Sequence, residues 1–183
     1  MTNTERPHSE SKLISAAKED RRAFAALYDK YYDQIFLFVY KRMESQASCG
    51  DVCSQVFLKA MTNLHQYEDR GFPFSSWLYR IAINEVNQYF RNNKKAIRAI
   101  SIDHAQVQFI ADEMGDGVEV ERALQALEAV LDDLDEPSLT LIEMRFFDQK
   151  SFKEMGQILG ISEGNAKIKT YRVLEKLKIE LLK

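Results

Sequence analysis

The sequence has few helix-breaking residues and few cysteines: 7 Gly, 3 Pro and 2 Cys among 183 residues. With so few breakers and with plentiful alanine, leucine, lysine, glutamate and glutamine, helices are favoured over strands. Cys49 and Cys53 are four residues apart, which stacks them on one helical face in a poor geometry for a disulfide. The longest clear apolar run, Ile35–Tyr40, is far too short to span a membrane, and the polar N-terminus is no secretory signal. These absences predict a reduced, cytoplasmic protein without membrane insertion.

Motifs for catalysis are also missing from the sequence. It contains no glycine-rich phosphate loop, no nucleophile elbow and no H-E-x-x-H pattern. The three histidines, His8, His65 and His104, are far apart in the chain. Cys49 and Cys53 could form part of a metal or redox site with His65, but buried spectator thiols are the simpler interpretation. We therefore expect a binding protein rather than an enzyme, with no catalytic residue, cofactor or metal.

The composition fits a compact protein with an uneven distribution of charge. Hydrophobic residues make up 45% of the chain, which is enough for a packed core. The formal net charge is −3, but the acidic residues gather between positions 96 and 137, and the segments on either side are mildly basic. The acidity of the whole chain therefore does not exclude a nucleic-acid partner at either end.

Apolar residues recur at intervals of three and four over most of the chain, as expected for helices with one buried face. The helices that this spacing predicts are Ser11–Lys18, one from Asp20 or Arg21 to Glu44, one from Gly50 or Asp51 to His65, Trp77–Asn93 capped by Ser75 or Ser76, Val120–Leu134, and Pro137–Phe147. Residues 99–117 show no convincing periodicity and contain an acidic, glycine-bearing stretch, which is typical of a linker. We predict an all-α fold with two small helical domains, residues 1–97 and 119–183, joined by an acidic linker over residues 98–118.

The C-terminal stretch SFKEMGQILGISEGNAKIKTYRVLEKLK has the pattern of two short helices joined by a tight turn. Ser151 and Glu154 form an S-x-x-E capping box at the start of a helix over Phe152–Leu159. Gly160 is well placed to end that helix in a left-handed conformation, and Ser162 can cap the next helix. The pattern predicts a helix-turn-helix in the C-terminal domain.

The last helix has two different faces. Apolar and small residues form a predicted buried stripe at Ala166, Thr170, Val173, Leu177 and Leu181. Basic side chains occupy much of the remaining surface, which suits attraction to phosphate and docking in the major groove of DNA. The alternative is a plain helical hairpin with a solvated lysine face.

Two long blocks resemble one family, the extracytoplasmic-function (ECF) sigma factors of bacterial RNA polymerase, within the sigma-70 superfamily. DVCSQVFLKAMTNLHQYEDRGFPFSSWLYRIAINEVNQYFRNNKK is similar to the family domain that binds core polymerase and melts the promoter. The C-terminal stretch resembles the domain that reads the minus-35 element, and AFAALYDKYYDQIF looks like the family's opening helix. The specific signal is VFLKA followed at the proper interval by F-x-x-WLYRIAIN, because many regulators carry a helix-turn-helix. The resemblance implies a sigma factor that binds core polymerase and then recognises and melts promoter DNA.

The resemblance also implies roles for individual residues. Those expected to dock on the β′ clamp helices of core polymerase are Asp51, Gln55 and either Phe57 or Leu58. Phe57 is at least as well explained as a core residue, so Leu58 is preferred. A loop over Gln66–Ser76 would hold a flipped base of the minus-10 element, with Tyr67 as its stacking platform and Trp77 as a core anchor. The expected minus-10 residues are Lys59, Asn63, Tyr67, Arg80, Asn84 and Arg91. The expected minus-35 residues are Ser162, Asn165, Lys167, Ile168, Lys169, Tyr171, Arg172 and Lys176.

Three positions depart from the family's usual pattern. Gln88 stands where an Asp is frequent, and Ile168 and Lys169 replace a small polar residue and an arginine in the recognition helix. These departures leave the fold intact but do not allow the promoter sequence to be predicted. In the family the linker mimics nucleic acid in the polymerase's RNA path, and the acidic residues expected to contribute here are Asp112, Glu113, Asp116 and Glu119.

The partners implied by the resemblance are core RNA polymerase and promoter DNA, with the protein acting as a monomer on the polymerase. An anti-sigma factor is common in the family, although no residue of this sequence indicates one. The main alternative is a helix-turn-helix regulator that acts on duplex DNA without replacing sigma. The VFLKA…WLYRIAIN block argues against it, because such a regulator would be expected to carry a ligand or receiver domain there.

Overall fold

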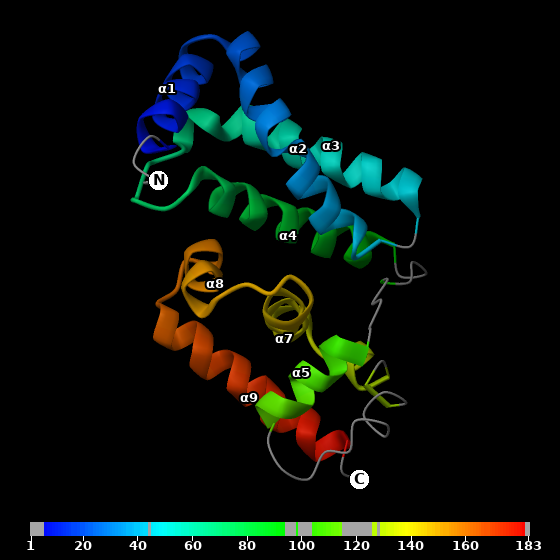
Figure 1. The fold of residues 1–183 in the computed structure, drawn as a ribbon. Helices are drawn as coiled ribbons and strands as arrows, with labels where there is room; N and C mark the ends of the chain where they lie inside the picture. The colour runs from blue at the N-terminus through cyan, green and yellow to red at the C-terminus, as the bar shows by residue number, and fades with distance from the viewer. Residues whose placement is uncertain are drawn as a thin grey trace. The chain divides into compact units, whose positions relative to one another are not determined.

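A computed structural model describes the conformation of most of the chain (Figure 1). The described residues are 6–43, 45–93, 98, 104–114, 126–127 and 129–181. Their regular structure is helical, apart from an isolated antiparallel bridge between Met43 and Arg98. The chain divides into two compact units, Met1–Ala99 and Ile100–Lys183. The predicted all-α fold is therefore confirmed, and none of the described helices is long and apolar enough to cross a membrane.

The first unit is a bundle of helices around one core. Its elements are α1 (Arg6–Glu19), the 3₁₀ turn η1 (Arg21–Ala23), α2 (Phe24–Tyr40), α3 (Gln46–Asn63), the 3₁₀ turn η2 (Leu64–Gln66) and α4 (Phe74–Asn92). Helix α3 packs against both α2 and α4, and α1 packs against α2. Each contributes an apolar face, and the fully buried side chains include Leu27, Ile35, Val56, Phe74, Leu78 and Val86.

Helix α4 begins three residues before the predicted start. Ser75 and Ser76 were expected to cap it, and this prediction is wrong because both lie inside the helix. The residue at the N-cap position is Pro73, whose side chain has no group that can accept a hydrogen bond. The carboxylate of Glu10 in α1 instead accepts a hydrogen bond from the Phe74 backbone N–H at 3.3 Å.

The two cysteines are buried in α3 as free thiols. Burial raises the pKa of the Cys53 thiol to about 12, so its reactive thiolate is scarce at neutral pH. His65 is exposed at the other end of this segment and bonds locally, its Nδ1 lying 3.0 Å from the Thr62 carbonyl oxygen. Within the described ranges, no group of three or more His, Cys, Asp or Glu residues could hold a metal ion.

The second unit contains a helix that the sequence pattern failed to reveal. Its elements are α5 (His104–Met114), α7 (Glu136–Ile142), the π-helical segment η3 (Glu143–Phe147), α8 (Phe152–Leu159) and α9 (Glu163–Leu181). Residues 99–117 were interpreted as a linker because they show no convincing periodicity, but the structure places α5 there, with Val107, Ile110, Ala111 and Met114 buried. Helix α5 contacts α9 and η3, so tertiary packing stabilises it within this unit. Of the helix predicted over Val120–Leu134, residues 126–127 and 129–132 are helical. Residues 120–125 and 128 lie outside the described residues, as do Asp116 and Glu119.

The helix-turn-helix forms as predicted. Ser151 and Glu154 make the reciprocal capping box, and Gly160 ends α8 with φ 71° and ψ 34°. The Ser162 hydroxyl accepts a hydrogen bond from the Asn165 N–H at 3.2 Å, which caps α9. Gly156 allows the turn to lie close to α8. A Cβ at this position would lie only 2.8 Å from the Ile161 carbonyl oxygen, so a larger residue would clash. The predicted stripe of α9 is buried at each of its five positions.

Candidate nucleic-acid interface

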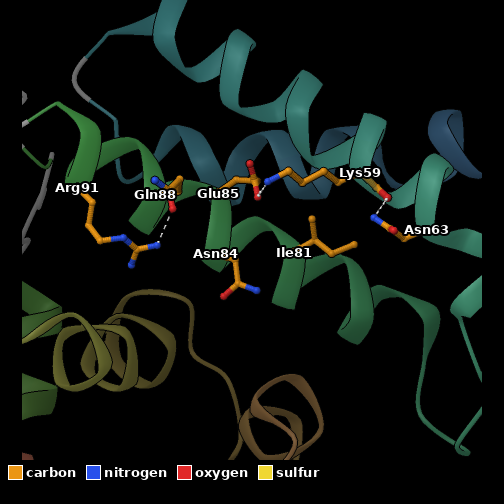
Figure 2. Close-up of a pocket in the computed structure, with 7 residues that line it drawn as sticks. All are labelled: Lys59, Asn63, Ile81, Asn84, Glu85, Gln88 and Arg91. Carbon is orange, nitrogen blue, oxygen red and sulfur yellow. Dashed lines mark hydrogen bonds and ion pairs between the residues drawn. The ribbon is translucent and has the colours of Figure 1, made fainter.

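A pocket of about 310 Å³ lies between the exposed edges of α3 and α4 (Figure 2). It is lined by Lys59, Asn63, Ile81, Asn84, Glu85, Gln88 and Arg91. Four of these were predicted as minus-10 residues from the sequence: Lys59, Asn63, Asn84 and Arg91. Amide groups and cations around one concave surface can meet base edges and phosphates together.

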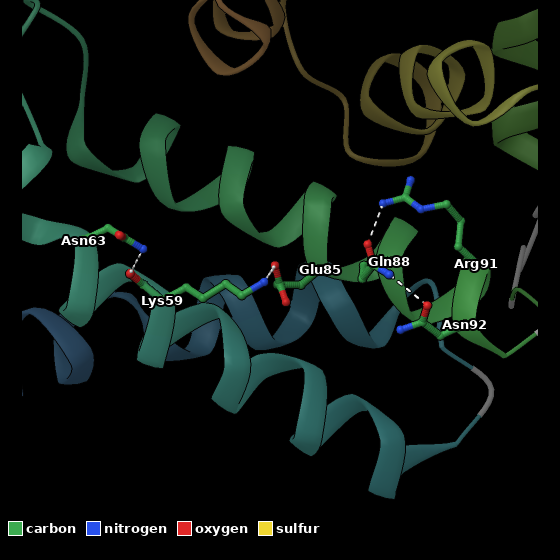
Figure 3. Close-up of polar contacts among 6 residues, drawn as sticks. All are labelled: Lys59, Asn63, Glu85, Gln88, Arg91 and Asn92. Carbon is green, nitrogen blue, oxygen red and sulfur yellow. Dashed lines mark hydrogen bonds and ion pairs between the residues drawn. The ribbon is translucent and has the colours of Figure 1, made fainter.

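An ion pair joins the two helices at this pocket (Figure 3). The Lys59 ammonium lies 2.6 Å from the Glu85 carboxylate, and the Lys59 side chain is 49% exposed while that of Glu85 is only 11% exposed. Asn63 donates from Nδ2 to the Lys59 carbonyl oxygen at 2.9 Å. Lys59 therefore already has an anionic partner in this structure, and a phosphate would have to compete with Glu85 for it.

Polar side chains continue along the outer face of α4. Arg80, Asn84, Gln88 and Arg91 are all exposed, and their spacing of four, four and three places them on one side of the helix. Arg91 donates from Nη2 to the Gln88 side-chain oxygen at 3.0 Å, and the Gln88 amide donates to Asn92 at 2.8 Å. Sequence reasoning treated Gln88 only as a departure from the family pattern and missed Ile81 and Glu85. Gln88 lies four residues after Asn84 and Ile81 lies three before it, so helical spacing could have included both.

Tyr67 does not provide the open stacking platform that was predicted. Its side chain is only 8% exposed, with its ring centroid 5.0 Å from that of Phe74 and 5.2 Å from that of Trp77. Burial raises the pKa of Tyr67 to about 12, consistent with an apolar surrounding. Trp77 thus packs in this aromatic cluster, as expected for a core anchor. The exposed aromatic of the same loop is Phe72, at 45% exposure, which follows Gly71 in the left-handed region.

The outer face of α3 carries the residues expected to bind polymerase. Asp51, Gln55 and Leu58 are exposed on one side of the helix, and Leu58 is 49% exposed. Phe57 is only 4% exposed and packs with its centroid 4.8 Å from the ring of Tyr28. Of the two residues considered as the apolar contact, Phe57 and Leu58, only Leu58 is therefore exposed to a partner.

The minus-35 candidates on α9 are exposed, with the exception of half-buried Tyr171. The Tyr171 hydroxyl donates to the Glu113 carboxylate of α5 at 2.5 Å, and this hydrogen bond, together with burial, raises the pKa of Tyr171. Arg145 also donates to Glu113, at 3.2 Å. The role expected for Glu113 in the polymerase's RNA path stays a prediction; in this structure its carboxylate binds Tyr171 and Arg145 within the same unit.

Comparisons with known proteins match both units. The family model Sigma-70 region 2 matches residues 27–96, and Sigma-70 region 4 matches residues 124–177. The ECF RNA polymerase sigma factor SigW of Bacillus subtilis is 28% identical over 178 residues, covering 93% of this chain and 95% of SigW. The ECF RNA polymerase sigma factor BldN of Streptomyces coelicolor is 28% identical over 167 residues, covering 85% of this chain but only 59% of BldN. The solved structure of CnrH in complex with the cytosolic domain of CnrY has a similar fold, with a TM-score of 0.59 at 21% identity, covering 94% of this chain and 96% of that one.

Proposed function

Because this chain belongs to the sigma-70 family, in its ECF group, we propose that it is a dissociable specificity subunit of RNA polymerase. It binds the core enzyme, reads two promoter elements and melts the downstream one, while the polymerase carries out the chemistry. The observation that carries this proposal is the pair of family matches, one in each compact unit, in the order region 2 and then region 4. We expect the protein to act in the cytoplasm, where polymerase and DNA are available.

The first unit has separate surfaces for polymerase and for DNA in this proposal. Asp51, Gln55 and Leu58 on α3 dock on the β′ clamp helices, with Leu58 as the apolar contact. The pocket between α3 and α4 receives the minus-10 strand, where Asn84 can hydrogen-bond a base edge. Arg80 and Arg91 attract the phosphates on either side of that position.

The second unit reads the minus-35 element through α9. Exposed Lys167, Lys169, Arg172 and Lys176 supply positive charge along the helix, and exposed Ile168 can contact a thymine methyl group. The helix N-terminus at Ser162 and Asn165 can hold a phosphate through backbone N–H groups. Tyr171 contributes to the groove only when its bond to Glu113 is exchanged for one to DNA.

An anti-sigma factor is a further proposed partner. The solved structure of CnrH contains the cytosolic domain of CnrY, and family likeness makes a comparable complex reasonable for this chain. The protein would act as a monomer on the polymerase.

Transcription with purified components tests the proposal. Core polymerase, the purified chain and genomic DNA fragments are mixed, and the 5′ ends of the transcripts are mapped. A sigma factor yields transcripts from defined start sites that are absent without it. A regulator of duplex DNA that does not replace sigma would add none, and that result would reject the proposal in favour of this alternative.

The burial of Tyr67 leads to a prediction about the neighbouring Phe72. Replacing Phe72 with alanine should lower promoter opening by on the order of tenfold, because stacking of one base on an aromatic ring stabilises it by about 1–3 kcal/mol. Phe72→Tyr keeps the ring and should restore opening. Permanganate reactivity of unpaired thymines in the polymerase complex measures the effect. If the Phe72→Ala variant opens the promoter as well as wild type does, Phe72 is not the ring on which the base stacks.

A further inference from the structure

Both ends of the loop at residues 67–74 are tied to α1. At the first end, the Lys18 ammonium donates to the Tyr67 carbonyl oxygen at 2.6 Å. At the second end, the Glu10 carboxylate accepts the hydrogen bond from the Phe74 N–H. Helix α1 also packs against η2, which leads into the loop. One helix therefore holds the start and the end of the loop that carries exposed Phe72.

Glu10 occupies a position where a helix needs an acceptor. The first backbone N–H groups of α4 have no partner within the helix, and Pro73 cannot supply one from its side chain. A carboxylate at this end is also favoured by the partial positive charge of the helix N-terminus. Glu10 thus caps α4 from a different helix, 64 residues earlier in the chain.

Other contacts hold the Glu10 side chain in place and keep it charged. The Lys30 ammonium lies 2.8 Å from its carboxylate, and the Tyr31 hydroxyl donates to the same oxygen. Burial alone would raise the pKa of Glu10, but the hydrogen bonds from Lys30, Tyr31 and the Phe74 N–H outweigh it, and the pKa lies below its usual value. Glu10 is therefore a preformed anchor fixed by α2.

We infer that Glu10 and Lys18 are positioning residues for promoter melting, because they fix both ends of the loop that presents Phe72. A loop that is already ordered loses less conformational entropy when it captures a base. Both residues lie before residue 27, where the match to Sigma-70 region 2 begins. The inference rests on the proposed function, because the proposed function is what assigns this loop the role of holding a melted base.

The test uses Glu10→Ala, Glu10→Gln and Lys18→Met in the full chain. Hydrogen exchange of the loop amides in the free protein reports loop order, and permanganate reactivity in the polymerase complex reports promoter opening. Glu10→Ala and Lys18→Met should each speed exchange at residues 67–74 and slow opening by on the order of tenfold, as expected for a lost charge-assisted hydrogen bond. Glu10→Gln keeps an acceptor oxygen for the Phe74 N–H. Its loop exchange and its promoter opening should therefore be closer to those of wild type than those of Glu10→Ala.

Lys12→Met is the matched control. Lys12 is an exposed lysine of α1, as is Lys18, but the hydrogen bonds that tie α1 to the ends of the loop come from Lys18 and Glu10, so opening should stay within about twofold of wild type. If Glu10→Ala fails to fold, exposed Lys18 still provides the test. Unchanged opening by Lys18→Met, or faster loop exchange without slower opening, would overturn the inference. Failure of the wild-type chain to direct any specific transcript would instead overturn the proposed function.

Discussion

Replacing Gly156 with alanine is expected to destabilise the second unit by about 1–3 kcal/mol. The new Cβ would lie 2.8 Å from the Ile161 carbonyl oxygen and 3.2 Å from the Glu163 backbone nitrogen. Both atoms belong to the backbone of the turn and the start of α9, so no flexible side chain can move aside. Hydrogen exchange of the α8 and α9 amides in the full chain measures this loss.

The control for this change is Gly164→Ala. Gly164 lies in the first turn of α9, and a Cβ there would meet nothing within 4 Å. Alanine at a helical position without a clash is expected to stabilise by up to about 1 kcal/mol. Equal effects of the two substitutions on exchange would contradict the close approach of the turn to α8. For promoter function, Gly156→Ala should weaken minus-35 reading while leaving polymerase binding by the first unit intact.

Replacing Leu58 with aspartate is expected to weaken binding to core polymerase by on the order of 30-fold, the effect of losing about 2 kcal/mol at a central apolar contact. The fold should tolerate the change, because the side chain is already 49% exposed. Competition with the wild-type chain for core enzyme gives the relative affinity.

Leu37→Asp is the control for the polymerase-binding prediction. Leu37 is 54% exposed, but it lies on α2 outside the proposed docking surface. Its replacement introduces the same charge and should leave competition close to that of wild type. If the Leu58→Asp variant competes for core polymerase as well as the wild-type chain does, Leu58 is not part of the interface. An equal loss of affinity in both variants would indicate a general effect of the added charge.

The parts of the fold predicted most closely are those whose signals are local in the sequence. The capping box of Ser151 and Glu154, the left-handed Gly160 and the cap at Ser162 involve residues within four positions of the groups that they bond. The buried stripe of α9 follows from helical spacing alone. Neighbouring residues fixed these features, so no knowledge of the distant chain was needed.

Two of the failures come from contacts between residues of different elements. The start of α4 depends on a carboxylate from α1, which no pattern around residues 73–76 can reveal. The Tyr67 ring was expected to be available to a base, but it packs against the rings of Phe74 and Trp77. Helix α5 was missed for another reason: Val107, Ile110, Ala111 and Met114 do recur at helical spacing, but this short pattern lies beside acidic, glycine-bearing residues and was overlooked.

The candidate site was predicted in part. The resemblance to the family implied that Lys59, Asn63, Asn84 and Arg91 are minus-10 residues, and the structure brings these four side chains to one pocket. The sequence did not indicate the pairing of Lys59 with Glu85, because the two residues belong to different helices and are 26 positions apart.

The Lys59–Glu85 pair affects how ionic strength should act on promoter melting. A cation that neutralises a phosphate normally displaces condensed counterions, and each such contact with a single strand contributes about −0.7 to the slope of log K against log salt concentration. Lys59 already carries its own counter-charge at 2.6 Å, and transferring it to a phosphate leaves the Glu85 carboxylate beside the DNA. The melting step should therefore depend less steeply on salt than the number of lysines and arginines around the pocket would suggest.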